Sequence, residues 1–129
     1  MKYKLSLALC ALLCSALSVA DEVSDLRDMA RASDDDRAIA IDCLIEIKID
    51  KANGWKSEEC LKYRYYSTNK LQAFKSDIKT AISAFKVYSK SGSANKNRIK
   101  RGLKQLIIIQ ENMKSIGDLS VKIKTESES

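Results

Sequence analysis

The 129-residue sequence contains no histidine and no proline, and it has only four glycines. Without histidine there is no Ser-His-Asp triad, no haem held by imidazole, no imidazole-based zinc site and no histidine acid–base catalysis. The missing prolines and few glycines favour long, uninterrupted helices. A chain of this length forms one small domain at most.

The sequence also lacks an apolar run long enough to cross a bilayer. The longest, from Leu5 to Leu17, has thirteen residues, against about 20 for a spanning helix. A basic segment, residues 1–4, precedes it, and the small residues of Ser18-Val19-Ala20 follow. These are the three parts of a secretory signal peptide. We therefore expect residues 1–20 to be cleaved and the protein to be exported, to a periplasm or to the medium.

Two cysteines, Cys43 and Cys60, remain after residue 20. In an exported chain two cysteines most often form one disulfide. A zinc site is excluded because there is no Cys-x-x-Cys motif and no further cysteine or histidine to complete the metal's ligands. The pair therefore predicts a structural disulfide, with no metal and no cofactor.

Apolar residues recur at spacings of three and four along most of the chain, which is typical of amphipathic helices. Antiparallel helices joined by short loops predict an all-α fold, a small up-and-down bundle of about four helices. We expect one helical domain over residues 21–123 and a disordered tail over 124–129. The expected helices are Asp21 to Ala32, a second from a Ser33 cap to Asn53-Gly54, a third from Ser57-Glu58-Glu59, a fourth over Leu71 to Tyr88 and a last over Ile99 to Gly117, with a loop from Ser89 to Asn95.

The segment from Ile39 to Ile49 is ambiguous. Isoleucine or cysteine stands at every second position, which is a strand pattern rich in β-branched residues. The rest of the chain offers no convincing partner strand, and an isolated strand leaves its backbone groups unpaired. We therefore expect a helix, with a strand as the alternative.

Charge is divided unevenly along the chain. Asp21 to Asp50 holds ten acidic and four basic residues, whereas Lys51 to Ser129 holds seven acidic and seventeen basic ones. Such asymmetry indicates an interaction surface, unless the two segments pack together and neutralise each other. The run Asp34-Asp35-Asp36 lacks the spaced ligands and the glycine turn of a calcium loop, so we expect it in the first turn of a helix.

Aromatic and basic residues are concentrated between Trp55 and Tyr66. Aromatic and arginine side chains dominate the binding energy of protein interfaces, although a core cluster beside the disulfide would use the same residues. Three tyrosines this close together cannot share one helix side, so at least one is expected to meet solvent. The candidate partner-binding residues are Trp55, Tyr63, Arg64, Tyr65 and Tyr66, with the acidic run at Asp34 steering the partner.

A second candidate surface is basic. On a helix, Lys100, Arg101 and Lys104 lie away from the apolar stripe that contains Ile99 and Leu103. A solvated helix face explains this pattern, and so does binding of a polyanion such as nucleic acid, lipopolysaccharide or anionic lipid. The candidate polyanion-binding residues are Lys96, Arg98, Lys100, Arg101 and Lys104.

No catalytic constellation emerges, and we expect no enzyme and no small-molecule substrate. Asp42 and Glu46 stand four residues apart, but helix surfaces carry such carboxylate pairs constantly. The sequence predicts a small exported binding protein that docks onto another exported protein, as inhibitors and immunity proteins do; the likeness is one of layout and not of sequence. The alternatives are a polyanion-binding envelope protein and a structural subunit that self-associates.

Overall fold

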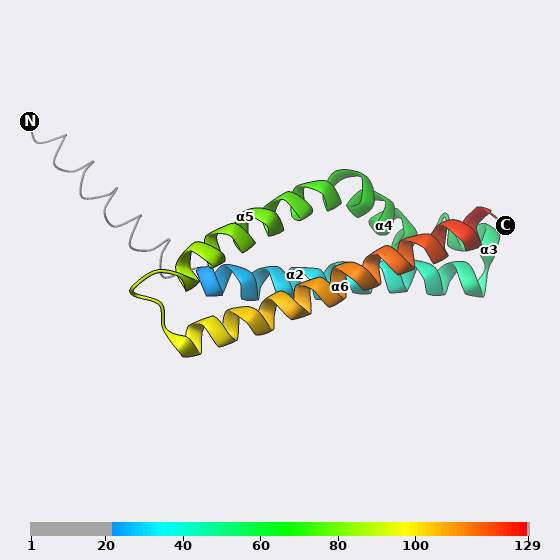
Figure 1. Ribbon diagram of the computed structural model, residues 1–129. Coiled ribbons are helices and arrows are strands. Elements are labelled where there is room, and N and C mark those ends of the chain that lie inside the picture. The colour runs from blue at the N-terminus through cyan, green and yellow to red at the C-terminus, as the bar shows by residue number, and fades with distance from the viewer. Residues whose placement is uncertain (1–21, 129) are drawn as a thin grey trace, which may run out of the picture.

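The computed structural model describes residues 22–128, and this part of the chain is helical apart from short connections (Figure 1). The prediction of an all-α bundle is confirmed, and the segment from Ile39 to Ile49 is helical. The expected signal peptide lies outside the described residues. The helices are α2 (Glu22–Ile49), α3 (Lys51–Gly54), α4 (Glu58–Asn69), α5 (Leu71–Ser89) and α6 (Lys96–Glu128).

The longest two helices, α2 and α6, make the most extensive contact in the bundle. They run in the same direction, and α4 and α5 together form the return pass between them (Figure 1). None of the helices in residues 22–128 is long and apolar enough to span a membrane.

The buried residues form two clusters at opposite ends of the α2–α6 pair. The first surrounds the two cysteines and includes Leu44, Ile47, Tyr63 and Ile123. The second lies near the loop that joins α5 to α6, and its buried members are Leu26, Ala30, Phe85, Tyr88 and Ile109. The first cluster joins α2, α4 and α6, and the second joins α2, α5 and α6.

Between the two clusters, a buried polar contact joins α2 to α6. The Asn112 side-chain amide donates to Ser33 Oγ at 2.9 Å and to Asp34 Oδ1 at 2.6 Å. Ser33 Oγ donates in turn to the Ala30 carbonyl at 2.7 Å. The expectation that Ser33 caps a new helix is therefore wrong. Its hydroxyl bonds back to the preceding turn, and α2 continues through it because Leu26 and Ala30 bury the same side of the helix as the later residues.

The ends of two helices also differ from the expectation. The α2 helix ends at Ile49, before Asn53-Gly54, because Asp50 accepts hydrogen bonds from the Asn53 backbone and side chain and so begins α3. The α6 helix does not end at Gly117 but continues to Glu128, which replaces the expected disordered tail over 124–128. Beyond Gly117, the buried Ile123 packs into the cluster around the disulfide and holds these turns on α2.

The middle of the chain agrees with the sequence. Ser57 Oγ accepts a hydrogen bond from the Cys60 backbone N–H at 3.2 Å, so Ser57 caps α4 as predicted. The third and fourth expected helices meet at Lys70, where α4 gives way to α5. The expected loop occupies residues 90–95.

Candidate docking surface

The predicted disulfide fastens α4 to α2. Cys43 and Cys60 are joined, their Cα atoms are 4.4 Å apart, and both side chains are completely buried. A covalent bond in the first turn of α4 fixes which side of the helix faces the core, and therefore which of its side chains meet solvent.

The structure separates the three tyrosines of α4. Tyr63 and Tyr66 are buried, whereas Tyr65 is 59% exposed, which confirms that one tyrosine meets solvent. Trp55 and Arg64 are half-buried. Tyr63 and Tyr66 therefore belong mainly to the core. The sequence did not show this because it did not fix how α4 is rotated on α2.

The two buried tyrosines hold α4 against its neighbours. The Tyr63 hydroxyl donates to Ser120 Oγ of α6, or accepts from it, at 2.8 Å. The Tyr66 hydroxyl is buried beside the Asp36 carboxyl of α2 and makes no hydrogen bond of good geometry. Burial, and then the negative charge of Asp36, raise the pKa of the Tyr66 hydroxyl well above its ordinary value.

Trp55 and Arg64 form a stacked pair beside α4. The Arg64 guanidinium carbon lies 4.7 Å from the centroid of the Trp55 ring, and Nη2 donates to the Trp55 carbonyl at 3.2 Å. Both side chains line a cleft between α4 and α6, together with Tyr63, Ser120 and Lys124. The cation–π contact and the hydrogen bond hold the indole and the guanidinium in fixed positions at the edge of this cleft.

Two exposed side chains continue this surface on the outer side of α4. Leu61 is 54% exposed and stands one helical turn before Tyr65. The Lys70 ammonium lies 5.7 Å from the centroid of the Tyr65 ring. Leu61 was not among the residues predicted from the sequence, although its spacing of four from Tyr65 places both on one helix side. We call the four residues Trp55, Leu61, Arg64 and Tyr65 the α4 surface.

The acidic run of α2 does not act as one unit. Asp34 is bonded to Asn112, Asp36 faces Tyr66, and only Asp35 is exposed without a contact of this kind among the described residues. The prediction that this run steers a partner therefore narrows to Asp35. Within residues 22–128 no group of three or more cysteine or acidic side chains is arranged to hold a metal ion.

The basic residues of α6 are mostly on the surface. Lys96, Lys100, Arg101 and Lys104 are exposed. Arg98 is half-buried, with its guanidinium carbon 5.7 Å from the centroid of the Tyr88 ring.

Leu103, predicted to lie in the buried stripe of α6, is instead 50% exposed, and Ile107 is 55% exposed. The buried side of α6 is narrow because α6 packs mainly on α2 and much less extensively on α5. Its buried residues are Gly102, Ile109, Asn112, Ile116 and Ile123.

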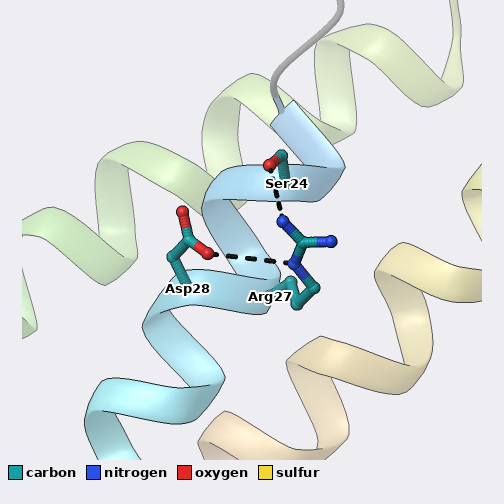
Figure 2. Close-up of polar contacts among 3 residues, drawn as sticks. All are labelled: Ser24, Arg27 and Asp28. Carbon is teal, nitrogen blue, oxygen red and sulfur yellow. Dashed lines mark hydrogen bonds and ion pairs between the residues drawn. The ribbon is translucent and has the colours of Figure 1, made fainter.

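The acidic and basic halves of the chain neutralise each other only in part. Arg27 pairs within α2 itself, with Asp28 at 3.8 Å and Ser24 at 3.4 Å (Figure 2). Across the contact with α6, Arg37 Nε donates to the Ser115 hydroxyl at 3.0 Å and not to a carboxylate. Within residues 22–128, the exposed Lys96, Lys100 and Lys104 form no ion pair with an acidic side chain.

Comparisons of this chain with protein-family models, curated proteins and solved structures find no match. The candidate surfaces therefore rest on the geometry of the chain itself.

The Asp36 carboxyl supplies a test of the α2–α4 contact. Burial raises its pKa above the ordinary value of 3.8. The neighbouring Tyr66 hydroxyl lowers this pKa, and the negative charge of Asp35 raises it further. The folded protein favours the protonated Asp36 carboxyl. Ionisation of Asp36 therefore lowers the free energy of unfolding once the pH rises above that ordinary value. Asp36→Asn is therefore expected to raise the free energy of unfolding at pH 7, and the gain should shrink toward zero as the pH falls below 3.8.

Urea denaturation at a series of pH values measures this gain, with Asp35→Asn, on the exposed neighbour, as the control. A gain that is the same at every pH, or an equal gain from Asp35→Asn, would contradict the assignment of the cost to the half-buried Asp36 carboxylate.

Proposed function

We propose that the protein is a small, exported, non-enzymatic binding protein that docks onto another exported protein through the α4 surface. The observation that carries the proposal is the exposure of Leu61 and Tyr65 on a helix that the Cys43–Cys60 disulfide fastens to the core. Large apolar side chains on a rigid helix bind with little loss of conformational entropy.

The neighbouring stacked pair adds the polar part of such an interface. Arg64 is already ordered over Trp55, so its remaining donors are held in place before a partner arrives. Tryptophan, tyrosine and arginine are the residues on which protein interfaces most often depend. The signal-peptide pattern and the disulfide support an exported setting, where an inhibitor or immunity protein of this layout would meet its target.

The test uses affinity capture from the envelope fraction of the source organism with purified, oxidised protein, followed by titration of the captured protein. The double variant Leu61→Ala/Tyr65→Ala is expected to raise the dissociation constant about 30-fold or more, because the loss of even one such anchor residue costs about 2 kcal/mol. The matched control is Val87→Ala, since Val87 is 72% exposed on α5 near the far end of the bundle.

Circular dichroism must show that the variants keep their helices. A partner that binds the double variant as tightly as it binds the parent protein would overturn the proposal. Equal weakening by Val87→Ala would do the same.

A further inference from the structure

We propose that the outer face of the first half of α6 binds the surface of an anionic membrane. This face is separate from the α4 surface: α4 packs near the C-terminal end of α6, and the basic face is at its N-terminal end (Figure 1). Six residues line one shallow hollow on it, and they combine cationic with aliphatic side chains: Asn97, Lys100, Arg101, Leu103, Lys104 and Ile107.

The charge on this face is of one sign. Lys96, Lys100 and Lys104 follow one another at intervals of one helical turn, Arg101 lies beside them, and all four side chains are exposed. No acidic residue occurs between Lys96 and Gln110 in the sequence. Cations arranged in this way are attracted to the negative surface potential of anionic lipids.

The apolar part of the face favours a membrane over a nucleic acid. Leu103 and Ile107 stand one turn apart among the lysines and are each at least half exposed. Aliphatic side chains are suited to the boundary between headgroups and acyl chains, above which long lysine side chains keep their ammonium groups in water. Binding of single-stranded nucleic acid relies on exposed aromatic rings, and the aromatic ring beside this face, that of Tyr88, is buried.

The opposite side of α6 explains why binding would be peripheral. Gly102 and Ile109 are buried in the bundle, where the Phe85 ring lies directly over Gly102. The helix is therefore already folded and cannot rotate freely into a bilayer. Only the outer side chains of α6 can contact the membrane. Because their apolar area is small, binding depends on the attraction between the lysines and anionic lipid.

Co-sedimentation with vesicles tests this inference, with a chain of residues 21–129 whose helical content is first verified by circular dichroism, so that the apolar N-terminal run does not contribute. The vesicles are made of phosphatidylcholine alone or of phosphatidylcholine mixed with phosphatidylglycerol. We expect binding to the anionic vesicles only, with a steep loss as salt is raised. Lys100→Glu/Lys104→Glu should abolish this binding. Leu103→Ala/Ile107→Ala should weaken it about tenfold, because the variant has less aliphatic area to bury in the membrane.

The matched control is Lys75→Glu/Lys79→Glu on α5, which has the same spacing and the same change in net charge at exposed positions. It should reduce binding far less than Lys100→Glu/Lys104→Glu. Leu61→Ala/Tyr65→Ala should bind vesicles like the parent chain, which separates this inference from the proposed function.

Three results would overturn the inference: binding to neutral vesicles at the same level, equal loss in the α5 control, or no effect of Leu103→Ala/Ile107→Ala. In the last case, capture of duplex DNA by the parent chain but not by Lys100→Glu/Lys104→Glu would identify the face as a nucleic-acid site.

Discussion

Replacing both cysteines by alanine is expected to lower the free energy of unfolding by about 3 kcal/mol. Cys43 and Cys60 are separated by 17 positions, and a bridge across a loop of this length removes that amount of chain entropy from the unfolded state. Alanine is the appropriate replacement because both sites are completely buried and serine would add a hydroxyl there. Urea denaturation of the oxidised protein and the variant measures the difference.

The position of the disulfide also predicts where the loss will be felt. The α4 helix touches α2 through Cys60, Tyr63 and Tyr66, so without the bond its hold on α2 depends on two tyrosines. Amide exchange in α4 should therefore quicken more than exchange in the middle of α6. Reductant should reproduce the loss in the parent protein and leave the double variant unchanged. Equal unfolding midpoints for the oxidised parent and the variant would refute the prediction.

Features of the structure that depend on residues close together in the chain could be predicted from the sequence. The Ser57 cap, the break near Lys70 and the apolar spacing from Leu71 to Tyr88 are local signals, and each is found where it was predicted. The Cys43–Cys60 pairing was equally accessible because no other cysteine follows residue 20. The helix over Ile39–Ile49 needed a wider argument, namely that the chain offers no partner strand.

Features that depend on contacts between residues far apart in the chain could not be predicted from the sequence. Ser33 resembles a helix cap, but its hydroxyl accepts from Asn112, 79 positions away, and nothing near Ser33 reveals that contact. Leu103 fits an apolar stripe, yet it is exposed because α5 covers only part of α6. The same reasoning applies to the candidate site. The sequence located the aromatic segment, whereas the rotation of α4 on α2 decided that Tyr65 is exposed and Tyr63 is not.

Gly54→Ala is expected to destabilise the protein by about 2–3 kcal/mol, the cost of overpacking a tight contact. Gly54 is buried where α3 turns against α2. A Cβ there would overlap the Glu46 carbonyl and would lie 2.7 Å from the Ile47 Cα. These neighbours are backbone atoms of a helix, so they cannot move aside as a flexible side chain can. The glycine is required for space and not for its conformational freedom, since no described glycine has a positive φ.

Gly117→Ala is the matched substitution, and it should have the opposite sign. Gly117 lies inside α6, is exposed, and has no atom within 4 Å of the position a Cβ would take. Alanine there should stabilise the protein by about 0.5–1 kcal/mol, because glycine loses more backbone entropy in a helix. Urea denaturation of both variants beside the parent protein gives the two signs directly. A loss at Gly117 would show that α6 ends near this residue, as the sequence suggested. No loss at Gly54 would show that α3 does not pack against α2 as described.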